Sequence, residues 1–149
     1  MIVRCNYEEL QALATGARLV VYADQAIDQP RGDAGDAGAV AAPSETEAAV
    51  EALLPQLTGD LSVATLREQR QLRLAVGTIC MDLHDSMESR FLDLHPADEH
   101  AVDLYFSYAH ARTVLERVEH AGAEMEAMIE VMTGEPATED AARDISFPD

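Results

Sequence analysis

Two histidine–glutamate pairs are spaced four residues apart, which places both side chains of each pair on one face of a helix. They are His84 with Glu88 and Glu116 with His120. An imidazole nitrogen and a carboxylate oxygen are both suitable ligands for a divalent metal ion. We take His84 and Glu88 as the candidate metal ligands. The competing interpretation is a half-buried histidine that is satisfied by hydrogen bonds, and on that interpretation no cofactor is expected.

Other catalytic signatures are missing from the sequence. Two-metal carboxylate bundles carry Glu-x-x-His on two helices, and none of the five histidines has an acidic residue three positions before it. There is no Gly-x-Ser-x-Gly elbow and no glycine-rich phosphate loop after a strand. In size and class the chain resembles the all-helical nucleotide pyrophosphohydrolases. However, Glu116/Glu119, Asp82/Asp85 and Asp85/Glu88 do not reproduce the two acidic magnesium motifs of that family.

A second group of charged residues combines arginine with glutamate. Arg73 and Arg112 fall at levels close to Glu116 and Glu119 when the two long helices described next are drawn side by side. Such a group indicates a partly buried charge network that fixes the register of the helices. Its alternative role is to bind the carboxylate or phosphate of a small ligand.

These residues belong to two long apolar stripes that mirror each other along the chain. One stripe contains Leu66, Leu72, Val76, Ile79, Leu83 and Met87, and the other contains Leu104, Tyr108, Ala111, Leu115, Val118, Met125 and Ile129. Both stripes step by three or four residues. When a residue of one stripe is paired with the residue expected to face it on the other, the sum of their two residue numbers is nearly constant. That relation is typical of an antiparallel helical hairpin. We predict helices over about 61–94 and 97–133, with Pro96 in the connection.

Capping boxes mark the starts of two shorter helices. In a capping box, two side chains three residues apart each satisfy a free backbone N–H of the first turn. Asn6 with Glu9 opens a helix over about 7–27, and Ser44 with Glu47 opens a second one that ends by about residue 57.

The remaining segments are poor in bulky apolar side chains. Residues 29–43 form a connector of Gly, Ala, Pro and Asp, which we expect to be mobile. Residues 135–149 form an acidic tail, which we expect to be flexible and frayed. The predicted fold is all-α, a four-helix bundle-like domain over 1–134 built on the hairpin, with no strong strand pattern.

Helical positions also predict which side of the hairpin is covered. Measured from the apolar seam, Cys80, His84, Tyr105 and Phe106 fall on one side, and His110 falls on the other. We expect the two shorter helices to cover the side with His84 and to leave His110 toward solvent. His84 and His110 should therefore not share a metal ion.

The two shorter helices cannot cover the whole hairpin, because a helix rises only about 1.5 Å per residue. We expect uncovered apolar surface near the end of the last helix, at Met125, Met128, Ile129 and Met132. Contiguous exposed apolar surface usually marks an association site, and methionine side chains adapt well to a partner. We therefore expect a homodimer that buries this end.

The chain is strongly acidic, with a formal net charge of −18 and arginine as its only basic residue besides histidine. Such a charge repels phosphate backbones and anionic lipids, so nucleic acid and membrane are poor partners. The acidic surface either keeps the protein soluble or favours binding to another protein of basic charge. Cys5 and Cys80 are too few for a disulfide framework, and no signal peptide or membrane-spanning stretch is recognisable. We therefore expect a cytoplasmic protein.

Together these features predict a non-enzymatic, acidic helical module that binds another protein in a regulatory or scaffold role. The alternative is a bundle that binds a small molecule or a divalent metal. In that case His84, Glu88, Arg73, Arg112 and Glu116 would line a pocket between the hairpin and the first two helices.

Overall fold

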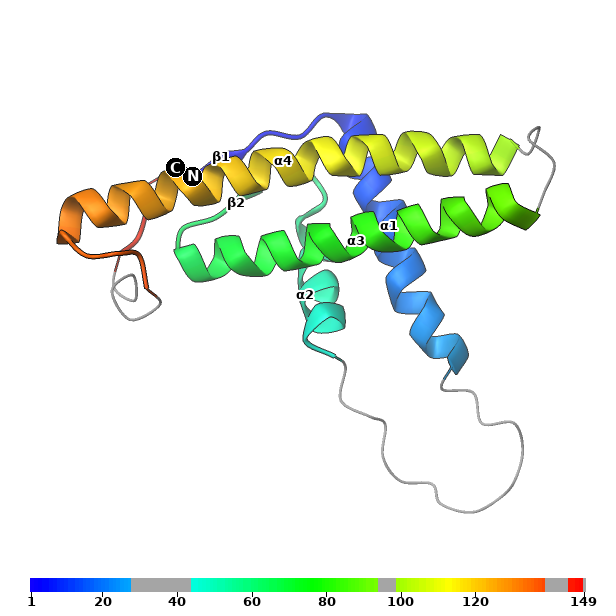
Figure 1. Ribbon diagram of the computed structural model, residues 1–149, viewed down its shortest axis with the longest axis horizontal. Coiled ribbons are helices and arrows are strands. Elements are labelled where there is room, and N and C mark those ends of the chain that lie inside the picture. Colours follow the sequence, from blue (N-terminus) through cyan, green and yellow to red (C-terminus); the bar gives the residue numbers. More distant parts are fainter. Residues whose placement is uncertain (28–43, 94–98, 139–144, 149) are drawn as a thin grey trace, which may run out of the picture.

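Four α-helices form the body of the molecule in the computed structural model, which describes residues 1–27, 44–93, 99–138 and 145–148 (Figure 1). The helices are α1 (Tyr7–Ile27), α2 (Glu45–Leu53), α3 (Leu66–Asp93) and α4 (Glu99–Thr133). A 3₁₀ turn, η1 (Leu54–Gln56), follows α2, and two short strands, β1 (Ile2–Val3) and β2 (Leu61–Ser62), pair antiparallel. The predicted all-α fold is confirmed. The predicted connector 29–43 and the hairpin tip lie outside the described residues.

Helices α3 and α4 run side by side as the predicted antiparallel hairpin (Figure 1). Their facing residues are fully buried, among them Val76, Ile79, Leu83, Ala111 and Val118. Two contacts across the hairpin fix its register. The rings of His84 and Tyr108 lie 5.4 Å apart, and Nε of Arg73 lies 3.2 Å from a carboxylate oxygen of Glu119. Both pairs follow the mirrored numbering of the two stripes.

Both predicted capping boxes form. The backbone N–H of Glu9 donates to Oδ1 of Asn6 at 2.8 Å, and the N–H of Asn6 donates to the Glu9 carboxylate at 2.9 Å. The same exchange joins Ser44 and Glu47 at the start of α2. These bonds satisfy backbone donors that have no partner inside a helix.

Helix α3 begins at Leu66, so the prediction that it starts near residue 61 is wrong. Leu61 pairs with Val3, and the N–H of Val63 donates to the carbonyl of Met1 at 2.9 Å. Leu61 and Val63 are buried while Ser62 between them is exposed, which is the alternation of a strand. This short sheet adds to the predicted helices, and the sequence shows no strong strand pattern that would have announced it.

A third capping box, which the sequence analysis missed, explains where α3 starts. The N–H of Glu68 donates to Oγ1 of Thr65, and the N–H of Thr65 donates to the Glu68 carboxylate, both at 3.2 Å. The carbonyl of Thr65 accepts the first helical bond, from Gln69. Because a capping residue adopts a non-helical backbone, the helix cannot continue back to Leu61.

Helix α1 crosses the hairpin and covers the side that bears His110, so the predicted choice of side is wrong (Figure 1). A Cβ added to Gly16 would lie 2.4 Å from Ile79 and 3.0 Å from Leu83, which shows how closely α1 approaches α3. His110 faces Glu8 of α1 at 3.8 Å. Burial raises the pKa of Asp82, which the sequence analysis placed on the solvated side. Small residues on α1 make this close contact possible.

The end of the C-terminal tail packs onto the domain, contrary to the expectation of a flexible tail over 135–149. Phe147 is buried, and its N–H donates to the carbonyl of Ala64 at 2.7 Å. The two ends of the chain lie next to each other (Figure 1), with the amino group of Met1 3.5 Å from the carbonyl of Pro148. Residues 145–148 therefore belong to the domain.

Candidate functional site

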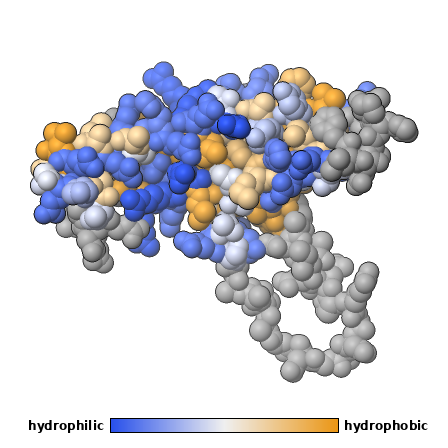
Figure 2. All heavy atoms as spheres, viewed as in Figure 1, coloured by the Kyte–Doolittle hydropathy of each residue, from blue (hydrophilic) through white to orange (hydrophobic). Residues whose placement is uncertain are grey.

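Four large apolar side chains are exposed on the two long helices of the hairpin. Met81 of α3 and Val102, Tyr105 and Phe106 of α4 are between 42% and 67% exposed, and we call this set the hairpin patch. The rings of Tyr105 and Phe106 meet edge to face, 5.7 Å apart. Figure 2 shows apolar side chains, in orange, lying among hydrophilic ones along the hairpin.

An open groove of about 960 Å³ adjoins the hairpin patch through Met81, and we call it the hairpin groove. Its apolar lining comes from both long helices, at Leu74, Met81, Tyr108 and Leu115. Gly77 also lines it, and a Cβ added there would meet nothing within 4 Å. The groove therefore has room for side chains of another molecule.

The predicted arginine–glutamate group is divided by the structure. Arg73 and Glu119 line the hairpin groove as an ion pair, with side chains that are 60% and 47% exposed. Arg112 and Glu116 form a separate exposed pair on α4, 3.9 Å apart, and they do not line the groove. The expectation of a partly buried network is corrected, because all four side chains are between 47% and 69% exposed.

The predicted metal ligands His84 and Glu88 do come together, and Asp85 joins them. One possible ligand atom from each of the three lies within 4.8 Å of the others. Nδ1 of His84 lies 3.5 Å from a carboxylate oxygen of Asp85, and its ring packs edge-on against Tyr108. All three residues lie in little more than one turn of α3 at the protein surface. The other predicted pair does not form, since His120 contacts Glu124.

The methionine-rich end of α4 is only partly exposed. Met125 and Ile129 have 0% exposure and belong to the core, so they cannot form part of an association surface as the sequence analysis expected. Met128 and Met132 are exposed, together with Val131, and we call these three residues the terminal patch.

A buried ion pair that the sequence analysis missed links α1 to α4. Glu9 is only 2% exposed, and both terminal nitrogens of Arg117 donate to its carboxylate, at 2.7 and 2.8 Å. Arg117 also donates to the carbonyl of Arg4 at 2.8 Å. The hydrogen bonds from Arg117 lower the pKa of Glu9. The sequence offered one signal, namely that Glu9 is both the partner of a capping box and part of an otherwise apolar helix face.

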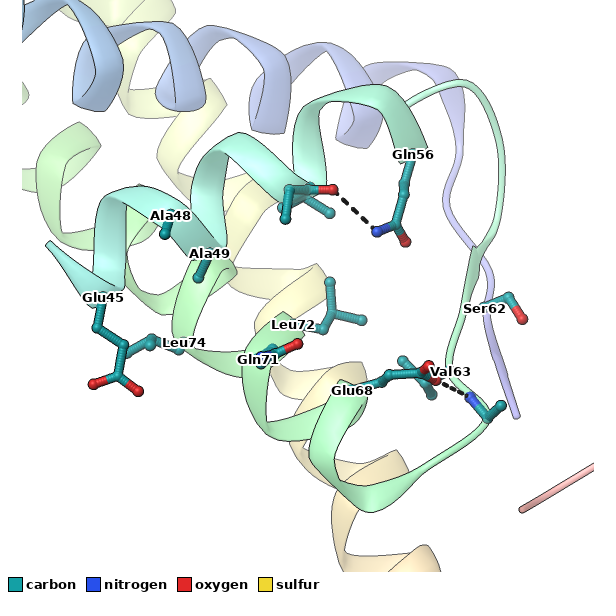
Figure 3. Close-up of a pocket in the computed structure, with 13 residues that line it drawn as sticks. Glu45, Ala48, Ala49, Gln56, Ser62, Val63, Glu68, Gln71, Leu72 and Leu74 are labelled. Atoms are coloured by element: carbon teal, nitrogen blue, oxygen red, sulfur yellow. Dashed lines mark hydrogen bonds between the residues drawn. The ribbon is translucent and has the colours of Figure 1, made fainter. Parts of the chain in front are cut away.

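A second hollow of about 520 Å³ lies between α2 and the start of α3 (Figure 3). Ala48 and Ala49 of α2 and Leu72 of α3 give it an apolar side, and Glu45 lies at one end. The carboxylate of Glu68, also in the lining, already accepts the N–H of Ala64 at 2.8 Å. Its polar side chains therefore serve local structure in part, and none of the predicted site residues lines it.

Neither cysteine is placed for nucleophilic chemistry. Burial raises the pKa of both Cys5 and Cys80 to about 11. Because the thiolate is the reactive form, both thiols are unreactive near neutral pH.

No helix among the described residues combines the length and the apolar character needed to cross a membrane. In comparisons with known proteins, the sequence matches no family model and no curated protein, and the fold matches no solved structure.

Proposed function

We propose that this chain is a helical protein–protein interaction module whose binding surface is the hairpin patch with the adjoining hairpin groove. One observation carries the proposal. Met81 on α3 and Val102, Tyr105 and Phe106 on α4 are each between 42% and 67% exposed, although all four are large and apolar. Large apolar side chains gain free energy when they leave water, and contiguous exposed patches of them mark binding sites.

The composition of the patch supports this role. Two aromatic rings in contact offer a large, stiff apolar surface that loses little entropy on binding. Aromatic residues and methionine are also enriched at the centres of protein interfaces. The patch lies toward the hairpin tip, and the hairpin extends past α1 there (Figure 1). A partner can therefore approach it without displacing α1.

The experiment places a photo-crosslinking amino acid at Phe106 of the full chain in its native cell. The control carries the same amino acid at Arg18, an exposed position on α1. We expect a discrete adduct from position 106 that disappears when Met81→Ser is added, and none from position 18. Equal labelling at both positions, or an adduct that is indifferent to Met81→Ser, would contradict the proposal.

A second candidate function is the binding of a small molecule or a divalent metal at the hairpin groove. The observation in its favour is that the groove brings Arg73, His84 and Glu119 together, with Asp85 beside His84. Thermal unfolding with Zn²⁺, Mn²⁺ and Fe²⁺ tests the metal version. A bound ion should raise the melting temperature, and His84→Ala should remove the increase. An unchanged melting temperature with all three ions would exclude a metal site of useful affinity.

A further inference from the structure

The carboxylates around the hairpin patch are arranged by helical spacing. On α3, Asp85 and Glu88 follow Met81 by four and seven residues, so the three side chains share one face. On α4, Glu99 precedes Val102 by three residues, and Asp103 precedes Phe106 by three. All four acidic residues are exposed. Exposed carboxylates therefore accompany the exposed apolar side chains on both helices, and we call these four acidic residues the acidic rim.

Few arginines lie near this rim in sequence, while Arg70 and Arg73 line the hairpin groove farther along α3. Arg90 and Arg112 are the arginines of residues 81–112. Arg112 is tied to Tyr108, whose hydroxyl accepts its hydrogen bond at 3.3 Å, and it faces Glu116. Within the described residues, no ion-pair partner contacts Glu99 or Asp103. Asp85 has the imidazole of His84 at 3.5 Å, and acidic residues outnumber arginines in this part of the chain.

From these charges we infer the class of partner, and the inference rests on the proposed function. We propose that the hairpin groove and the hairpin patch seat a basic amphipathic helix. Its apolar face would enter the groove over Leu74, Gly77 and Met81, and its lysine and arginine side chains would reach Asp85 in the groove lining and Glu88 beyond it. Complementary charge of this kind speeds association and selects the partner.

The dimensions of the groove fit one helix. The α3 residues that line it run from Arg70 to Asp85, which is about 22 Å at the rise of an α-helix. A partner helix of about 15 residues spans that length. At Gly77 the missing side chain leaves the groove open, since an added Cβ would touch nothing.

Charge argues against a second copy of this chain on the same surface. Each copy carries a formal net charge of −18, so pairing two hairpin patches would bring two acidic rims together. Nucleic acid and anionic lipid meet the same repulsion. The occupant that the surface favours is therefore a protein segment with lysine or arginine beside apolar residues.

Two designed peptides of about 15 residues test the inference, because their length matches the groove. Both carry the same leucine face, and one has lysine and the other glutamate at the polar positions. Fluorescence anisotropy measures their binding to the full-length chain. We expect saturable, salt-sensitive binding of the lysine peptide and none of the glutamate peptide. Comparable binding of both peptides would overturn the inference.

Three variants locate the binding site. Gly77→Leu fills the groove and should weaken binding of the lysine peptide by about tenfold or more. The double variant Asp85→Asn with Glu88→Gln should also weaken binding of the lysine peptide. The charge-matched control is Glu51→Gln with Glu130→Gln, which removes two carboxylates elsewhere and should weaken binding less. If Gly77→Leu leaves the affinity for the lysine peptide unchanged, or if the two charge variants lose the same affinity, the peptide is attracted only by the net charge of the chain. Either result would overturn the inference. Circular dichroism checks that each variant is folded.

The outcome separates the partner class from the proposed function. A discrete Met81-dependent adduct at position 106, without binding of the lysine peptide, leaves the interaction module standing and overturns the basic helix. If there is neither an adduct at position 106 nor binding of the lysine peptide, both the interaction module and the basic helix are overturned.

Discussion

At Glu9 a carboxylate is held almost entirely out of water, on a protein whose net charge is already strongly negative. The desolvation of that charge is offset by two hydrogen bonds from Arg117 and one from the N–H of Asn6. One side chain thus caps the start of α1 and also joins it to α4. Because Arg117 remains partly exposed, forming this pair costs less desolvation free energy than forming a fully buried pair.

Replacing Glu9 with Gln should lower the free energy of unfolding at pH 7 by about 2 kcal/mol, because hydrogen bonds to a charged group are lost. The pKa of Glu9 is lowered in the folded chain. The stability it provides is therefore present above the usual pKa of a glutamate and is lost as the pH falls through the lowered value. Urea unfolding between pH 7 and pH 3 should show a shallower pH dependence in Glu9→Gln than in the unaltered protein. Glu8→Gln, at an exposed neighbour, is the control, and a matching change there would contradict this account.

Two glycines of the hairpin should respond in opposite ways to the same substitution. A Cβ at Gly122 would lie 2.3 Å from Nε2 of Gln69, a buried side chain that donates to the carbonyl of Val118 at 2.8 Å. Gly122→Ala should therefore destabilise the protein by about 1–3 kcal/mol. Gly77→Ala meets no atom and should stabilise it by about 0.5–1 kcal/mol, because alanine is the better helix former.

Thermal and urea unfolding of both single variants measure these effects. Combining Gly122→Ala with Gln69→Ala relieves the clash, so the loss should be smaller than the sum of the two single losses. Strict additivity would mean that Gln69 does not limit the space at residue 122.

At the scale of elements, the start of α3 depends on a single capping box. Thr65→Ala removes the hydroxyl that accepts the N–H of Glu68. The free energy of unfolding should fall by about 1 kcal/mol. The matched control is Thr113→Ala, in an exposed position inside α4, where alanine is the better helix former. Equal effects of the two substitutions in urea unfolding would contradict the role of Thr65 as a cap.

The hairpin could be predicted from sequence because its signal is long and internally redundant. Leu66 to Met87 and Leu104 to Ile129 repeat one period, and every opposing pair tests the same register. The capping boxes at Asn6 and Ser44 were readable for a similar reason, since each links two residues at a fixed spacing. The short sheet offered no such redundancy, because a pair of two-residue strands leaves almost no pattern.

The covered side of the hairpin could not be read from positions around each helix. Both flanks of the seam carry apolar residues, with Ala75 and Val114 on one and Cys80 and Tyr105 on the other. The choice depends on how closely a third helix can approach, which Gly16 permits, and on the match between Glu9 and Arg117. For that reason the sequence identified Arg73, His84 and Glu119 as possible site residues but placed them under the first two helices. In the structure they line an open groove.

At the scale of the whole molecule, two sets of exposed apolar side chains lie on different parts of the hairpin. The hairpin patch has a carboxylate rim that suits a basic helix. The terminal patch of Met128, Val131 and Met132 lies near the end of α4, and α4 extends past the start of α3 (Figure 1). We propose that the terminal patch forms the contact of a homodimer. A protein with both contacts could hold two partner segments at once, as a scaffold does.

The two proposed associations should depend on salt in opposite directions, because like charges on two copies repel each other while a basic partner carries the opposite charge. Salt screens charges over about 10 Å at 0.1 M. Raising NaCl should therefore increase the dimer fraction seen in sedimentation or light scattering, while it weakens binding of the lysine peptide. Met128→Glu with Met132→Glu should give the mass of a single chain at every salt concentration, because it places carboxylates in the contact. Met81→Glu, a control in the other patch, should leave the dimer intact. A single-chain mass for the unaltered protein at all salt concentrations, or a dimer that survives the paired substitution, would rule out the terminal patch as its contact.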